Sequence, residues 1–133
     1  MVVAALRTEL LFVRGPKAAL GVGLRARATL EKLVQTQRPR AVAVVGYAGG
    51  LRPELRPGAL LLVDRLLDEE GVVEVDAELL ARAKQRLAWA QVGPLFTDRK
   101  LTPREEKDKL AGLALAVDME TSFLARELRA RGI

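Results

Sequence analysis

Short apolar runs recur along the chain, each bounded by glycine, proline or charged residues. Four of these runs predict buried strands, at residues 2–6, 41–45, 59–63 and 113–117. Because the runs do not alternate with polar residues, we expect a sheet that is covered on both faces. A fifth segment, residues 92–96, is interrupted by Gly93 and Pro94, which predicts an irregular or edge strand.

Helical periodicity separates the predicted strands. Apolar residues at helical spacing predict helices around residues 24–34, 80–90 and 119–128. Another helix should begin at Pro103, with Thr102 as its N-cap, and end near Leu110. Strands that alternate with helices predict a single α/β domain over residues 1–133, with three layers and a mostly parallel central sheet flanked by helices.

Composition restricts the chemistry that the chain can perform. The 133 residues include neither cysteine nor histidine. This excludes disulfides, thiolate nucleophiles, Ser–His and Cys–His pairs, and metal sites that use imidazole or thiolate ligands. Carboxylates, lysines, arginines and backbone dipoles remain, so we expect neither a metal ion nor an organic cofactor.

Charge and hydropathy bear on partners and location. The net charge of +5 would suit a polyanion, but the arginines are scattered in pairs and aromatic residues make up only 4% of the chain. Solvated helix faces explain this pattern better than a nucleic-acid surface. No apolar stretch approaches the roughly 20 residues that span a bilayer, and no basic segment precedes the first apolar residues. We expect a soluble, cytoplasmic protein that binds neither membranes nor nucleic acid.

Asparagine is absent, and leucine, alanine, arginine and glutamate are abundant. This bias is compatible with a heat-adapted protein and equally with GC-rich coding.

Acidic residues, glycines and a methionine gather at the expected carboxyl ends of three strands. Glu9 follows the first strand, residues 46–50 (Gly-Tyr-Ala-Gly-Gly) follow the second, and Asp118, Met119 and Glu120 follow the last. Taken singly, these features predict a surface acid, a turn, and acids that complement a helix dipole. Taken together, they lie where parallel sheets bind ligands. Carboxylates accept hydrogen bonds from a cis-diol and methionine packs on a sugar or base, so the set suits a nucleoside.

The sequence resembles the nucleoside phosphorylase and nucleosidase superfamily, especially its methylthioadenosine/S-adenosylhomocysteine nucleosidases and the hopanoid-associated phosphorylases. Two segments carry this resemblance: residues 46–58, which include GYAGGL and LRPG, and residues 116–121, AVDMET. Gly93-Pro94-Leu95 and Asp98 lie between them in the family's order. The resemblance extends along nearly the whole chain and implies the α/β fold of that superfamily.

The resemblance also implies the residues around the nucleophile. Glu9 matches the acid that serves the nucleosidases as general base for the attacking water. Gly21 and Gly23 match a glycine pair near the pocket of the nucleophile, and Arg7 would lie nearby.

A second group of residues matches the part of the family that binds the substrate. The backbone of Ala48 and Gly49 would face the base and the ribose. Met119 matches a methionine that lies against the ribose, and Glu120 matches the acid that binds the ribose hydroxyls.

The chain departs from the family's pattern at several positions. Tyr47 stands where a small residue is common near the nucleophile, and Lys100 stands where an apolar residue faces the substrate. Only residues 10–20 occupy the place of a longer hairpin. In the family, another strand begins near residue 133 and ends in an aspartate that protonates the departing purine. We therefore expect a C-terminally shortened version of the fold, with little or no glycosidase activity in these 133 residues.

These observations predict a protein that acts on the N-glycosidic bond of a purine nucleoside. Glu9 favours water as the nucleophile, whereas Arg7 and Arg14 could hold inorganic phosphate as a co-substrate, and the sequence leaves both open. The alternative is a catalytically inactive remnant of the family that binds nucleosides or only self-associates. In either case we expect a homo-oligomer, a dimer or larger.

Overall fold

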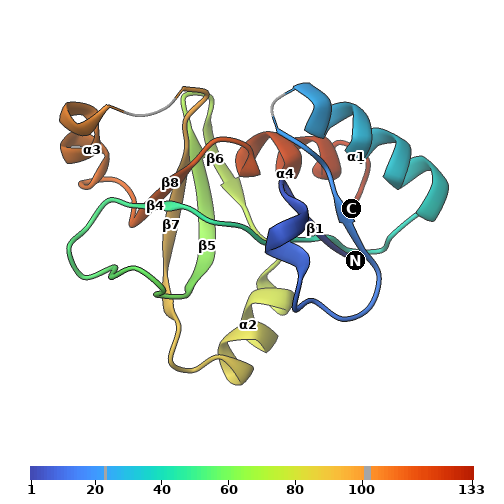
Figure 1. Ribbon diagram of the computed structural model, residues 1–133, viewed down its shortest axis with the longest axis horizontal. Coiled ribbons are helices and arrows are strands. Elements are labelled where there is room, and N and C mark those ends of the chain that lie inside the picture. Colours follow the sequence, from blue (N-terminus) through green and yellow to red (C-terminus); the bar gives the residue numbers. More distant parts are fainter. Residues whose placement is uncertain (23, 101–102) are drawn as a thin grey trace. The chain divides into compact units, whose positions relative to one another are not determined.

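The computed structural model describes residues 1–22, 24–100 and 103–133 (Figure 1). Contacts within the chain group these residues into two compact units. The first unit comprises residues 1–47 and 123–133, and the second comprises residues 48–122. The single domain expected from the sequence stays a prediction.

The first unit contains a three-stranded parallel sheet in the order β2-β1-β3. Its central strand is β1 (Val2–Ala4), flanked by β2 (Lys17–Ala19) and β3 (Ala43–Val44). The 3-10 turn η1 (Arg7–Leu10) follows β1, and α1 (Leu24–Gln37) connects β2 to β3. Helix α4 (Thr121–Arg129) begins in the second unit and continues into the first.

An apolar core joins the sheet of the first unit to the two helices. It is formed by residues of the strand regions, of α1 and of α4: Val3, Leu20, Ala26, Leu30, Val34, Leu124 and Leu128. The spacing within α1 repeats every four residues, so these side chains lie on one side of the helix. Leu30 and Val34 belong to the apolar pattern of the sequence, whereas the buried Ala26 does not and Ala28, which does, is exposed.

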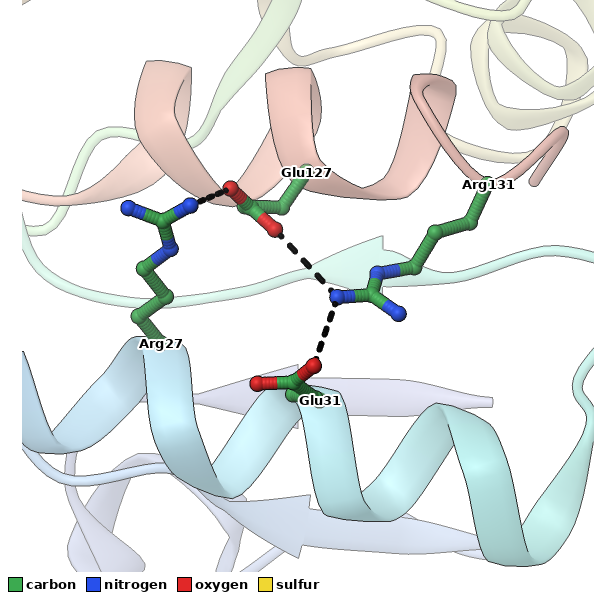
Figure 2. Close-up of polar contacts among 4 residues, drawn as sticks. All are labelled: Arg27, Glu31, Glu127 and Arg131. Carbon is green, nitrogen blue, oxygen red and sulfur yellow. Dashed lines mark hydrogen bonds and ion pairs between the residues drawn. The ribbon is translucent and has the colours of Figure 1, made fainter.

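Charged residues connect the same two helices outside this core. Figure 2 shows Glu127 of α4 between two arginines, 2.5 Å from Arg27 of α1 and 3.5 Å from Arg131. Arg131 also lies 3.2 Å from Glu31 of α1. These four side chains form one chain of ion pairs across the helix pair. Because they are only partly buried, each pair contributes modestly to stability.

The second unit contains a five-stranded sheet in the order β4-β8-β7-β5-β6. Its strands are β4 (Gly49–Gly50), β5 (Leu61–Asp68), β6 (Gly71–Glu74), β7 (Gln91–Thr97) and β8 (Ala116–Asp118). The three inner strands run parallel, whereas β4 and β6 pair antiparallel at the edges. Helix α2 (Ala77–Arg86) precedes β7, and α3 (Arg104–Leu110) precedes β8. The α/β class and the mostly parallel arrangement predicted from the sequence are thus confirmed.

Of the two alternatives for the fifth strand, the edge position is wrong, because β7 lies in the middle of its sheet, whereas the irregularity is confirmed. The register of β5 shifts between Val63 and Leu66, opposite Pro94. This irregularity accommodates a residue that has no N–H to donate. At Gly93, a Cβ would lie 2.4 Å from Cδ1 of Leu115, so the glycine leaves room for that side chain. Gly93 and Pro94, the two residues that indicated an edge strand, therefore both fit in a central strand.

The remaining elements follow the predictions with small differences. Helix α3 ends at Leu110, as expected, but begins one residue later than predicted, with Pro103 as its N-cap; Thr102 lies outside the described residues. Helix α2 begins after Asp76, whose Oδ1 accepts a hydrogen bond from Leu79 N at 2.8 Å. The sequence analysis missed β2, β4, β6 and η1. Within the described ranges, every helix is too short or too polar to cross a lipid bilayer.

Candidate functional site

The candidate residues fall in both units. The first unit contains Arg7, Glu9 and Gly21; the second contains Ala48, Gly49, Met119 and Glu120. Gly23 lies outside the described residues.

Glu9 is held by two backbone amides. It lies in η1 directly after β1, where Leu6 N donates to Oε2 at 2.7 Å and Tyr47 N donates to Oε1 at 3.0 Å. A carboxylate has about four lone-pair positions, so each oxygen can accept a further hydrogen bond. Glu9 is thus an oriented acid at the end of a strand rather than the mobile surface acid of the simplest interpretation, and it can still accept a hydrogen bond from water.

Gly46 allows the carboxylate of Glu9 to approach the chain after β3. A Cβ at position 46 would lie 3.2 Å from Oε1 of Glu9, closer than most contacts of a real Cβ. Val45 N, one residue earlier, donates to Val3 O at 2.9 Å and keeps this segment beside β1. The glycine that the sequence suggested for a turn therefore has a second role, as the neighbour of the acid.

Gly21 lies at the same edge of the first sheet. The backbone N–H groups of Leu20 and Gly21 donate to the carbonyl oxygens of Ala4 and Ala5 at 2.8 and 3.0 Å. The φ angle of Gly21, +84°, favours glycine. Because the three strands run parallel, Glu9, Gly21 and Gly46 all lie at their carboxyl ends. Arg7 is exposed in the same turn as Glu9.

In the second unit, β4 places a glycine backbone beside the end of β8. Gly49 pairs with Val117 and Gly50 with Ala116 in antiparallel register. When this register continues by one residue, Ala48 comes beside Asp118. The backbone of Ala48 and Gly49 therefore runs along the strand that leads into Met119 and Glu120. The structure brings these predicted substrate-binding residues together within one unit.

Met119 and Glu120 form the two-residue turn between β8 and α4. Met119 is 37% exposed, although it directly follows a buried strand. Glu120 is half-buried. Both side chains are therefore at least partly accessible to solvent at the end of a strand.

Asp118 binds the start of α4, as its simpler structural interpretation predicts. Its Oδ2 accepts hydrogen bonds from the backbone N–H of Thr121, at 3.0 Å, and from the Thr121 hydroxyl. Its Oδ1 accepts from the Thr97 hydroxyl at 2.7 Å, and Thr97 Oγ1 in turn accepts from Ser122 N at 3.0 Å. We call the side chains of Thr97 and Asp118, with Thr121 and the backbone N–H of Ser122, the Thr97–Asp118 relay; the hydroxyl of Ser122 is not part of it. Sequence reasoning missed Thr97, whose only signal was a hydroxyl at the end of a predicted strand.

Two further polar side chains lie close to this part of the second unit. Nζ of Lys107, on α3, is 4.0 Å from the position that a Cβ on Gly49 would occupy. Asp98 follows β7; its backbone N–H donates to Asp118 O at 2.9 Å, and its Oδ1 accepts from Lys100 N at 3.0 Å. Lys107 had no signal in the sequence beyond its charge.

The described part of the chain contains no cluster of three or more acidic residues that could hold a metal ion. The arrangement instead provides strand-end carboxylates and backbone donors. Such groups can orient hydroxyls and accept a proton from water.

No family model matches the sequence, and the search of curated proteins finds no significant match. Solved structures, however, match along nearly the whole chain. The S-adenosylhomocysteine nucleosidase of Streptococcus pyogenes, in complex with 5-methylthiotubericidin, has a TM-score of 0.87 at 21% identity, covering 98% of this chain and 77% of that one. The futalosine hydrolase of Helicobacter pylori has a TM-score of 0.85 at 20% identity, covering 99% and 81%.

A third similar structure contains a nucleoside. It is a mutant of the Helicobacter pylori 5′-methylthioadenosine/S-adenosylhomocysteine nucleosidase with 5′-methylthioadenosine in its active site. Its TM-score is 0.87 at 18% identity, covering 99% of this chain and 79% of that one. At these identities the likeness establishes a shared fold. This chain therefore shares the fold of these nucleosidases and of the futalosine hydrolase.

Proposed function

We propose that this protein binds purine nucleosides and acts on their N-glycosidic bond. The observation that carries the proposal is the Met119–Glu120 turn beside the Ala48–Gly49 backbone, in a fold whose solved examples are nucleosidases. The proposal assigns ribose binding to this turn. Glu120 would accept hydrogen bonds from the ribose hydroxyls while Met119 packs against the sugar.

Glu9 is the proposed general base. Two backbone amides orient its carboxylate, and lone pairs remain on both oxygens to accept a proton from water. In hydrolysis, the water oxygen bonds to C1′ as the bond from C1′ to the purine nitrogen breaks. The bonding electrons leave with the purine, which takes up a proton from solvent, and Glu9 returns the proton of the attacking water to solvent. Negative carboxylates favour the cationic, oxocarbenium-like transition state of this reaction.

Phosphate is the other nucleophile to test, because Arg7 is exposed in the same turn as Glu9. Hydrolysis releases free ribose, whereas phosphorolysis releases a ribose 1-phosphate only when phosphate is supplied. A soluble, cytoplasmic homo-oligomer also stays a prediction, and analytical ultracentrifugation would test the oligomeric state.

Calorimetry with the 133-residue chain tests ligand binding directly. We expect adenine, adenosine and 5′-methylthioadenosine to bind at millimolar concentration. Glu120→Gln should weaken the binding of both nucleosides by about tenfold or more, because each charge-assisted hydrogen bond is worth about 1.5 to 3 kcal/mol. The affinity for adenine, which has no ribose, should be unchanged.

Glu106→Gln is the matched control, since Glu106 is an exposed acid on α3. Its binding of all three ligands should equal that of the unmodified chain. No heat with any ligand would remove the proposal. Equal losses for adenine and the nucleosides in Glu120→Gln would show that Glu120 is only an acid at the start of a helix.

Turnover distinguishes an enzyme from a protein that only binds. Release of adenine, followed by chromatography, should disappear in Glu9→Gln if Glu9 is the base. Binding without release, in the unmodified chain, would favour the catalytically inactive alternative.

A further inference from the structure

The turn that carries Met119 and Glu120 is fixed at both of its ends by one set of hydrogen bonds. Asp118 immediately precedes the turn and Thr121 immediately follows it. The carboxylate of Asp118 accepts from the backbone N–H of Thr121 at 3.0 Å and from its hydroxyl. A two-residue turn closed in this way has few free backbone dihedrals, so its side chains leave the chain in defined directions.

Thr97 anchors this arrangement to the sheet. Thr97 is the register partner of Asp118 in the pairing of β7 with β8. Its hydroxyl donates to Asp118 Oδ1 at 2.7 Å and accepts from Ser122 N at 3.0 Å. One side chain on β7 therefore connects the last residue of β8 to the first turn of α4.

Burial makes these contacts difficult to replace. Thr97 is 2% exposed and Ser122 is fully buried, so water cannot substitute for a lost partner at the Thr97 hydroxyl. A valine would fill the same space without needing hydrogen bonds. The hydroxyl of Thr97 thus forms hydrogen bonds with the carboxylate of Asp118, before the turn, and with the backbone N–H of Ser122, after it.

We propose that Thr97 and Asp118 are positioning residues that hold the Met119–Glu120 turn in the conformation that binds the ribose of the nucleoside. This inference rests on the proposed function, because it assigns ribose binding to Glu120. A carboxylate that binds a cis-diol must place both oxygens correctly. Loosening the turn therefore weakens nucleoside binding without affecting contacts to the free base.

Thr97→Val is the principal test, because it removes the hydroxyl and keeps the shape. By calorimetry on the 133-residue chain, we expect 5′-methylthioadenosine to bind about 5-fold to 10-fold more weakly, as for one lost hydrogen bond. The affinity for adenine should be unchanged. Thr97→Ser retains the hydroxyl and should restore nucleoside binding.

Ser122→Ala is the matched control. Ser122 is equally buried and lies in the same cluster, but in the described part of the chain its Oγ has no hydrogen-bond partner. Removing that hydroxyl should leave the affinities for 5′-methylthioadenosine and adenine unchanged. If Thr97→Val does not fold, Asp118→Asn breaks the other end of the relay. An amide has a single acceptor oxygen and cannot accept from all three donors.

Amide hydrogen exchange in the chain without ligand gives a second measurement. Thr97→Val should accelerate exchange at the N–H groups of Thr121 and Ser122, whereas Ser122→Ala should not. Unchanged exchange in Thr97→Val would overturn the inference.

The binding results also separate the inference from the proposed function. If Glu120→Gln weakens nucleoside binding but Thr97→Val does not, the inference is overturned alone. If the unmodified chain binds no nucleoside, the proposed function fails and the inference fails with it. If Thr97→Val lowers the affinities for adenine and for the nucleoside equally, the substitution damages the fold in general, and the inference is overturned as well.

Discussion

Glu9 in the first unit and Asp118 in the second are both strand-end carboxylates, but they are held by different groups. Backbone amides of Leu6 and Tyr47 hold Glu9, and these hydrogen bonds are exposed. Side-chain hydroxyls contribute two of the hydrogen bonds to Asp118, in a partly buried setting. Every residue except proline has a backbone N–H, so the groups that hold Glu9 do not depend on the identity of residues 6 and 47. The position of Glu9 depends instead on the path of the backbone. The position of Asp118 depends on which residues surround it.

This difference bears on how readily each carboxylate could be displaced. Beside Glu9, position 46 must be a glycine, because a Cβ there would crowd the carboxylate. Around Asp118, both Thr97 and Thr121 must carry a hydroxyl. Substitutions around Asp118 should therefore lower the stability of the protein more than substitutions around Glu9.

The largest effect is expected from Asp118→Ala. It removes the acceptor of three hydrogen bonds and leaves the buried Thr97 hydroxyl without its acceptor. We expect a loss of about 2 to 4 kcal/mol in the free energy of unfolding, measured with urea. Glu9→Ala should lose less than about 1 kcal/mol, because water can reach the amides that it exposes. Equal losses in the two variants would contradict the comparison.

A smaller loss of stability is expected when Gly93, a buried glycine of the second unit, is replaced by alanine. In Gly93→Ala, the new Cβ would lie 2.4 Å from Leu115 Cδ1. Displacing Leu115 within the sheet should lower the free energy of unfolding by about 1 to 3 kcal/mol. In a Leu115→Ala background the same substitution should cost little, and a full cost there would show that the collision with Leu115 is not its cause.

Gly46→Ala tests the corresponding contact in the first unit. Its Cβ would meet the carboxylate of Glu9 at 3.2 Å, and a partly exposed side chain can move away. We expect a loss of about 1 kcal/mol or less, which should disappear in a Glu9→Ala background. Gly112→Ala, whose Cβ would make an ordinary 3.5 Å contact with Lys109 O, is the control. A cost that persists without Glu9 would refute the proposed role of Gly46.

The smallest effect concerns the ion pairs of the first unit (Figure 2). Glu127→Ala removes the contacts to Arg27 and Arg131, which are 69% and 30% exposed. We expect a loss of no more than about 1 kcal/mol at low salt, and a smaller one at about 1 M salt because of screening. A loss that does not change with salt would mean that Glu127 contributes mainly through packing.

Local patterns in the sequence were sufficient to predict most of the fold. Apolar runs located β1, β3, β5 and β8, and helical spacing located α1, α2 and α4, because both patterns are local in the sequence. The burial expected for two of these runs is wrong, since residues 41–45 and 59–63 are partly buried or exposed. Proline and the acids after it identified α3. Glu9, Gly49, Met119 and Glu120 could be chosen as candidates because each follows an apolar run within a few residues of the sequence.

Contacts between distant segments were decided only by the tertiary structure. The hydrogen bond from Tyr47 N to Glu9 spans 38 residues, and that from Thr97 to Asp118 spans 21. The central position of β7 depends on pairing with β5 and β8, which the composition of β7 does not reveal. The sequence determined where most strands and helices lie and where the carboxylates occur, because apolar runs, helical spacing and residue types are local properties. The folded chain determined which groups hold those carboxylates, because hydrogen-bond partners are selected by register and strand order.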